Sequence, residues 1–222
     1  MTSPPPRAGW LIAIEGIDGA GKSTLQQALA RALRRRGFAV RLRREPTDAT
    51  LGRLAQQAGV EDPWTGAVYF TVDRHLAAER LRRDLRRYDV VLTDRSFYST
   101  LAYQASRLPR RERVRLEQLQ RQATVVPDRV LLLDLPPSWM TRRLARRAKV
   151  RGPLERSRSL ASVARAYLAL ARRHRWIVLD ARRPRRELAA AAVRALGPLR
   201  GPRRRRPGGK TLSARAGPRG SR

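Results

Sequence analysis

The 222-residue sequence contains no cysteine and few aromatic residues, and both shortages limit what the protein can be. Without cysteine, neither a disulfide framework nor a thiolate metal site is possible. Aromatic residues make up only 5% of the chain, although 41% of the residues are hydrophobic, enough for a core. No apolar stretch reaches the roughly 20 residues that span a membrane, and residues 1–7 lack the apolar run of a signal peptide. We therefore expect a cytoplasmic protein with one main domain.

Acidic residues are also scarce, since 18 Asp and Glu stand against 50 Lys and Arg, a formal net charge of +32. A charge of this sign is typical of proteins that bind nucleic acid. Most arginines, however, fall in helical patterns on the expected solvent faces, for example in residues 31–36 and 80–87. Arg, Ala and Pro dominate the composition, which indicates a codon bias rather than a selected binding surface.

Residues 16–23 carry the pattern G-x-x-x-x-G-K-S, directly after the apolar segment 10–14 and before a helical pattern. The glycines allow a tight turn, so that successive backbone N–H groups point at phosphate oxygens, and the helix adds its positive dipole end. Lys22 reaches the β- and γ-phosphates, and the Ser23 hydroxyl is a Mg²⁺ ligand. The predicted nucleotide-phosphate site comprises Gly16, Ile17, Asp18, Gly19, Ala20, Gly21, Lys22, Ser23 and Thr24.

Short apolar segments alternate with helical patterns along the chain. The expected strands cover residues 10–15, 38–43, 89–93, 129–134 and 176–179. The expected helices cover residues 22–36, 51–58, 64–87, 97–107, 110–124, 138–147, 160–173 and 184–196. Continuous apolar strands between helices indicate an α/β fold, a P-loop NTPase-type three-layer sandwich whose five-stranded parallel sheet has helices on both faces.

The ends of the chain differ from the region between them. Residues 10–198 are expected to form the domain, preceded by a flexible N-terminus over residues 1–9. Residues 199–222 are rich in Pro, Gly and Arg and have no apolar periodicity, so we expect a disordered basic tail.

Further polar motifs follow the second and third expected strands. Glu45 and Pro46 come after the second strand, and Asp94-Arg95 ends the third. Because loops after parallel strands lie along one edge of a sheet, where ligands bind, we expect these residues to converge with the phosphate loop. Elsewhere Phe70 and Arg74, spaced i and i+4, share one face of a helix.

These motifs, in this order and over about residues 10–196, resemble the thymidylate kinase family. The resemblance implies that the γ-phosphate of ATP is transferred to dTMP, giving dTDP for dTTP synthesis, with Mg²⁺ as cofactor. It also implies a homodimer. Residues 142–158 resemble the lid of the family, which closes over ATP, and the basic tail would permit non-specific polyanion binding.

The resemblance implies roles around the acceptor base and sugar. Phe70 would stack on the thymine ring, and Arg74 would reach the base edge or its neighbourhood. Ser99 or Thr100 would hydrogen-bond the base, and Tyr103 would crowd the 2′ position and so favour deoxyribose. The implied acceptor-binding residues are Glu45, Phe70, Arg74, Arg95, Ser99, Thr100, Tyr103 and Gln104.

The resemblance also implies roles around the phosphates. Arg95 would hold the dTMP phosphate, and Asp18 would face the 3′-hydroxyl and the metal-bridged phosphates. Ser23 would bind Mg²⁺ directly, and Asp94 would contact the same Mg²⁺ through a water molecule. Because the phosphate loop contains no arginine, a lid arginine would supply charge to the transition state. The implied catalytic residues are Lys22, Arg95, Asp18, Arg147 and Arg151.

Two alternative functions stay open at this point. One is a kinase of the same fold that acts on another nucleotide or nucleoside, with altered selectivity at Phe70, Thr100 and Tyr103. The other is a non-catalytic relative that associates with nucleic acid through its charge. Phe70, Arg74 and Tyr103 could also be ordinary packing residues of their helices.

Overall fold

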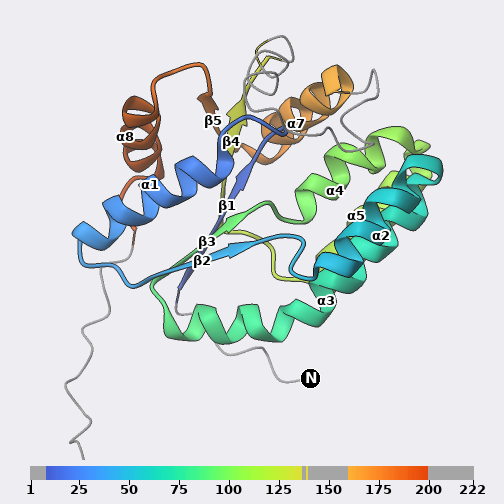
Figure 1. Ribbon diagram of the computed structural model, residues 1–222, viewed down its shortest axis with the longest axis horizontal. Helices are drawn as coiled ribbons and strands as arrows, with labels where there is room; N and C mark the ends of the chain where they lie inside the picture. The colour runs from blue at the N-terminus through green and yellow to red at the C-terminus, as the bar shows by residue number, and fades with distance from the viewer. Residues whose placement is uncertain (1–8, 137–138, 140–159, 200–222) are drawn as a thin grey trace, which may run out of the picture.

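The computed structural model describes residues 9–136, 139 and 160–199, which form a parallel sheet between two layers of helices (Figure 1). The strands are β1 (Trp10–Glu15), β2 (Val40–Arg44), β3 (Val90–Asp94), β4 (Arg129–Asp134) and β5 (Ile177–Asp180). They pair in the order β2-β3-β1-β4-β5, and each neighbouring pair is parallel. The predicted fold class is therefore confirmed.

The helices lie on both faces of the sheet (Figure 1). They are α1 (Lys22–Arg35), α2 (Ala49–Glu61), α3 (Pro63–Arg87), α4 (Phe97–Tyr103), α5 (Arg110–Ala123), α7 (Leu160–His174) and α8 (Arg185–Leu196), with a 3₁₀ turn, η1 (Ala105–Arg107). Helices α1 and α8 cover one face, α3, α4 and α5 cover the other, and α2 packs along α3. None of these helices is long and apolar enough to cross a membrane. Most of the predicted helix 138–147, the lid and the tail lie outside the described residues.

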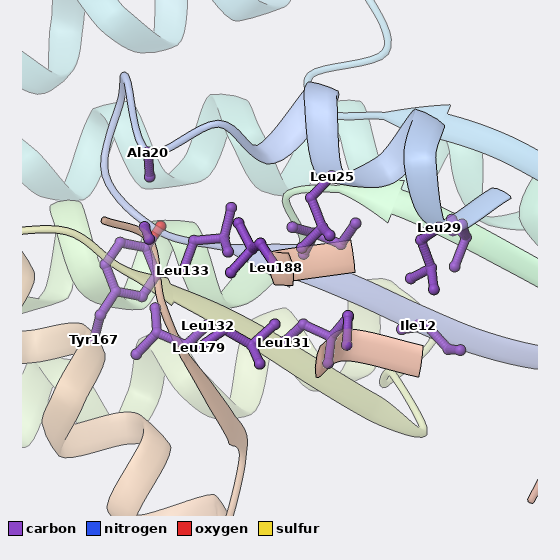
Figure 2. Close-up of a cluster of buried hydrophobic side chains, with 14 of the residues drawn as sticks. Ile12, Ala20, Leu25, Leu29, Leu131, Leu132, Leu133, Tyr167, Leu179 and Leu188 are labelled. Carbon is purple, nitrogen blue, oxygen red and sulfur yellow. The ribbon is translucent and has the colours of Figure 1, made fainter. Parts of the chain in front are cut away.

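The core is built around β1, whose residues alternate between the two faces of the sheet. Ile12 and Ile14 belong to the cluster that contains Leu25 and Leu29 of α1 (Figure 2). Ala13, on the opposite side, packs in a second cluster with residues of α3, α4 and α5. Leu29 is fully buried, which contributes about 1.5–3 kcal/mol of hydrophobic stabilisation. This packing fixes where β1 ends and therefore where the glycine-rich loop begins.

Three strands begin later than predicted. β3 starts at Val90 instead of residue 89, and β2 and β5 start later because the residues before them complete the preceding helix. The Phe38 amide donates to the Leu33 carbonyl of α1 at 3.2 Å, and β2 starts only at Val40. In the same way the Trp176 amide donates to the Ala171 carbonyl of α7 at 2.9 Å, so β5 starts one residue later. The amides of Phe38 and Trp176 therefore donate hydrogen bonds to the ends of the preceding helices and not to a neighbouring strand.

The helix predicted over residues 97–107 consists of two elements. Helix α4 ends where the Gln104 amide donates to the Thr100 carbonyl, and η1 follows as a separate 3₁₀ turn. Leu108 then has extended backbone, as expected before Pro109, whose ring disfavours helical geometry at the preceding residue.

Candidate active site

The loop between β1 and α1 depends on glycines at positive φ. Gly16, Gly19 and Gly21 have φ of 140°, 79° and 100°. At Gly16 a Cβ atom would lie 2.7 Å from the Leu133 carbonyl oxygen, so a larger residue does not fit there. Gly21 caps α1 without a side-chain hydrogen bond, and the first turn of α1 contains no acidic residue. The N-terminus of α1 therefore offers its amides and positive dipole end to an anion.

Lys22 is the buried cation of this loop. Its Nζ donates to the carbonyl oxygens of Gly16 and Ile17, each at 3.0 Å, and lies 3.5 Å from Asp18 Oδ1. Burial, and then the positive charge of Arg95, lower the pKa of Lys22 to about 8, although the Asp18 carboxylate opposes the shift. The ammonium group is thus held at the loop, close to where the amides would bind phosphate.

Ser23 and Asp94 form a pair of hard oxygen donors beside the loop. Ser23 Oγ donates to Asp94 Oδ2 at 2.6 Å, because β3 lies next to β1 with Asp94 in register with Ile14. The described part of the chain contains no cluster of three or more acidic, His or Cys residues that could hold a metal. Mg²⁺, however, is usually bound through one or two protein oxygens, waters and substrate phosphates. The Ser23–Asp94 pair fits that kind of site.

Arg95 connects the end of β3 to the phosphate loop. Its φ is 76°, and its amide donates to the Ile14 carbonyl at 3.0 Å, which turns the side chain toward the loop. The guanidinium forms an ion pair with Asp18 and donates to Ser99 Oγ at 3.1 Å. It also lies over the Tyr103 ring, 5.4 Å from the ring centroid. The structure therefore brings four of the predicted site residues into contact.

The buried carboxylate of Glu15, for which the sequence predicted no role, holds two residues that contact Arg95. Glu15 is fully buried and accepts hydrogen bonds from the Ser96 amide at 2.8 Å, Ser96 Oγ at 2.7 Å and Ser99 Oγ at 2.7 Å. Tyr167 of α7 donates to the same carboxylate at 3.1 Å and lies 3.4 Å from Arg95 Nη1. The sequence contained one signal for such a role, because Glu15 is a charged residue at the end of an otherwise apolar strand.

Arg74 lies at the centre of a second buried network. Its Nε donates to Glu45 Oε2 at 2.6 Å, Nη1 to Thr100 Oγ1 at 2.8 Å and to Gln120 Oε1 at 3.0 Å. Nη2 donates to the Ser96 carbonyl at 3.2 Å. Four of the five guanidinium N–H groups are thus engaged within the protein, and the residue is only 4% exposed. Burial raises the pKa of Glu45, although the positive charge of Arg74 opposes this.

The remaining predicted acceptor residues lie beside these networks. Phe70 is half-buried, and its ring centroid lies 5.7 Å from the Arg74 guanidinium carbon, so the two share the predicted helix face. Tyr103 is buried, and its burial raises its pKa to about 12. The Gln104 amide oxygen is buried and has no hydrogen-bond partner among the described residues.

Asp73, which also lacked an assigned role, fixes the loop after β2. Its carboxylate accepts hydrogen bonds from the Thr47 amide at 2.9 Å, Thr47 Oγ1 at 2.7 Å and the Asp48 amide at 2.8 Å. The predicted lid residues Arg147 and Arg151 lie outside the described residues. The loops after β1, β2 and β3 lie at one edge of the parallel sheet, which confirms that they converge.

A parallel α/β sheet with a glycine loop, a buried lysine and a Ser–Asp pair defines the class of P-loop nucleotide-binding proteins. A sequence profile described as thymidylate kinase matches residues 14–192. A thymidylate kinase of Leifsonia xyli subsp. xyli is 40% identical over 200 residues, covering 86% of this chain and 95% of that protein. Probable thymidylate kinases of Metallosphaera sedula and Sulfurisphaera tokodaii are 33% and 34% identical, covering 82% and 83% of this chain and 90% and 94% of those proteins. The chain belongs to the thymidylate kinase family.

Proposed function

We propose that the chain transfers the γ-phosphate of ATP to dTMP, giving dTDP and ADP. Family membership supports this reaction, and the Arg95–Asp18 ion pair is the single observation that carries it. The pair places an arginine suited to an acceptor phosphate at the mouth of the loop suited to a donor phosphate. Two phosphates bound at these places would lie next to each other, as direct transfer requires.

The donor side would be formed by the phosphate loop. Its amides and Lys22 would hold the β- and γ-phosphates, with Ser23 bound directly to Mg²⁺ and Asp94 bound through water. When bound, Mg²⁺ would neutralise charge on the phosphate oxygens. We further propose that Arg147 or Arg151, assigned from the sequence alone, supplies charge to the transition state.

The acceptor phosphate would be held by Arg95, which would exchange its contact with Asp18 for phosphate oxygens. Asp18 would then face the 3′-hydroxyl of the acceptor. The contacts of Arg95 with Ser99 and Tyr167 would keep the guanidinium in place during this exchange. Phosphoryl transfer depends mainly on such positioning and on neutralising spread charge, so little covalent chemistry is needed from the protein.

The base would lie against Phe70, with Tyr103 beside the sugar. Ser99 and Thr100 were predicted as alternative hydrogen-bond partners of the base, and their hydroxyl groups make different hydrogen bonds within the protein. Ser99 Oγ already donates its proton to Glu15, whereas Thr100 Oγ1 accepts from Arg74 and keeps its own proton. This difference favours Thr100 as the donor to the base, with Gln104 Oε1 as a buried acceptor nearby.

The experiment that tests the proposal measures both products. ATP, dTMP and Mg²⁺ are incubated with the full chain, and we expect dTDP and ADP in equal amounts, with none formed in excess EDTA. Lys22→Ala should reduce turnover by several orders of magnitude, because it removes the charge next to the transferring group. Arg113→Gln, an exposed position on α5, is the control and should leave turnover unchanged. Release of ADP without dTDP would contradict the proposal.

We also propose a homodimer, which the surface of α3 supports. Val68, Val72 and Leu76 are 37%, 41% and 60% exposed and recur every four residues, so they form one apolar stripe. Sedimentation of the wild-type chain should give twice the monomer mass. Leu76→Glu should give the monomer, whereas Ala195→Glu, at an exposed position of α8, should leave the dimer intact. A monomeric wild-type chain would refute the proposal.

A further inference from the structure

A groove runs between α1 and α8, which lie side by side on one face of the sheet (Figure 1). Its volume is about 730 Å³, and small apolar residues line it, among them Ala28, Ala32, Ala189 and Val193. Six exposed arginines line it as well: Arg31, Arg35, Arg36, Arg185, Arg186 and Arg194. The groove therefore combines a shallow apolar floor with a strongly positive rim.

The charge of this groove is not compensated by ion pairs within the described residues, whereas part of the charge on the opposite face of the molecule is. There Arg43 pairs with Asp84 at 2.7 Å, and Arg173 pairs with Glu117 at 3.0 Å. Within residues 9–136 and 160–199, none of the six groove arginines forms an ion pair with a carboxylate. A codon bias accounts for many arginines without ion pairs in the described part of the chain, including Arg80, Arg83 and Arg113 on the opposite face, but the groove gathers six of them around one apolar floor.

We propose that this groove binds duplex nucleic acid through its phosphate backbone. Guanidinium groups present planar donor forks that match phosphate oxygens, and phosphate contacts supply most sequence-independent affinity for nucleic acid. The groove has no aromatic lining residue, so it offers no platform on which the bases of a single strand would stack. Helix α1, with 14 residues, is about 21 Å long, which matches the phosphates along about six base pairs.

Other occupants fit the groove less well. A membrane surface is bound by helices that expose large apolar residues, whereas the apolar residues here are Ala and Val. A second copy that docked its own groove here would place six arginines against six like charges. Thr24, which was predicted for the nucleotide site, borders one end of the groove, whereas Arg31 and Arg35 lie in the second half of α1, away from the phosphate loop. The inference therefore does not depend on the proposed function.

The test uses the full chain and two variants that lose the same charge. The groove variant is Arg31→Gln/Arg35→Gln/Arg194→Gln. The control is Arg80→Gln/Arg83→Gln/Arg113→Gln, at exposed positions of α3 and α5 that form no ion pair within the described residues. Binding of a labelled 20-base-pair DNA duplex is followed by fluorescence anisotropy at several salt concentrations, and the tail is intact in every protein.

We expect the groove variant to bind the duplex at least about 10-fold more weakly, and the control less than about 2-fold more weakly. The slope of log K against log[salt] should fall by about 2–3 in the groove variant, about one for each phosphate that the protein no longer neutralises. Unchanged kinase turnover in both variants shows that they are folded. Equal losses in both variants, no loss in the groove variant, or tighter binding of the matching single strand would each overturn the proposal.

Discussion

The Arg95 guanidinium and the Asp18 carboxylate form an ion pair that links the end of β3 to the phosphate loop. Asp18 is the more exposed partner, at 37% against 17% for Arg95. A dianionic phosphate that arrives at this pair can replace the single carboxylate as the partner of the guanidinium. We therefore expect binding of the acceptor phosphate at Arg95 to release Asp18 and so to affect the phosphate loop that would bind the donor.

Arg95→Ala should weaken dTMP binding by about 100-fold and change ATP binding by less than about 3-fold. Hydrogen bonds to charged groups are worth about 1.5–3 kcal/mol each, and loss of about 3 kcal/mol corresponds to roughly 100-fold in affinity. Isothermal titration with each nucleotide measures both effects. Arg95→Lys keeps the charge without the planar fork and should give an intermediate loss for dTMP. Equal losses for both nucleotides would mean that Arg95 has a structural role instead.

ATP affinity should fall as the pH rises above about 8. The pKa of Lys22 is lowered to about 8 by burial and by Arg95, so in the free protein the ammonium loses its proton in this range. Bound phosphates favour the charged form, so that binding at higher pH must take up a proton. Titrations between pH 7 and 9.5 should show constant affinity below pH 8 and a decline toward tenfold per pH unit above it. The Lys22→Ala variant should bind ATP weakly at every pH and should not show this decline. If the decline persists in the variant, a group other than Lys22 causes it.

Glu45→Ala should destabilise the fold by about 3–5 kcal/mol, because it leaves Arg74 as an unpaired charge in a buried site. Denaturant unfolding monitored by circular dichroism measures the change. Glu79→Ala, which breaks the exposed ion pairs of Glu79 with Arg82 and Arg86, is the matched control and should cost about 0–1 kcal/mol. Similar effects of the two substitutions would show that the Arg74 network does not hold the site together.

Tyr103→Ala should reduce the preference for deoxyribose over ribose in the acceptor. The buried ring lies against Arg95, so its removal would open space beside the sugar. Tyr103→Phe keeps the ring and should keep the preference, because bulk rather than the hydroxyl excludes the 2′-oxygen. The ratio of kcat/KM for dTMP and ribothymidine monophosphate measures selectivity. An unchanged ratio in the alanine variant would leave Tyr103 as a packing residue.

The sequence predicted the local features of this site better than the long-range ones. The phosphate loop is a local signal, since glycines, Lys22 and Ser23 have fixed spacing, and the continuous apolar strands predicted the parallel sheet. The partners of Glu15 could not be predicted, because Tyr167 lies 152 residues further along the chain and α7 has an ordinary apolar pattern. Likewise, the family resemblance implied that Arg74 reaches the base edge or its neighbourhood, but only the fold brings Gln120 to its side chain.

The central claim, that this chain phosphorylates dTMP, is tested most directly by a coupled ADP-release assay across nucleoside monophosphates. The assay compares kcat/KM for dTMP, dUMP, AMP, GMP and CMP at saturating ATP and Mg²⁺. We predict the highest value for dTMP, a lower one for dUMP and poor turnover of the three ribonucleotides. Equal or better turnover of AMP, GMP or CMP would contradict the account and indicate a kinase of the same fold with another acceptor.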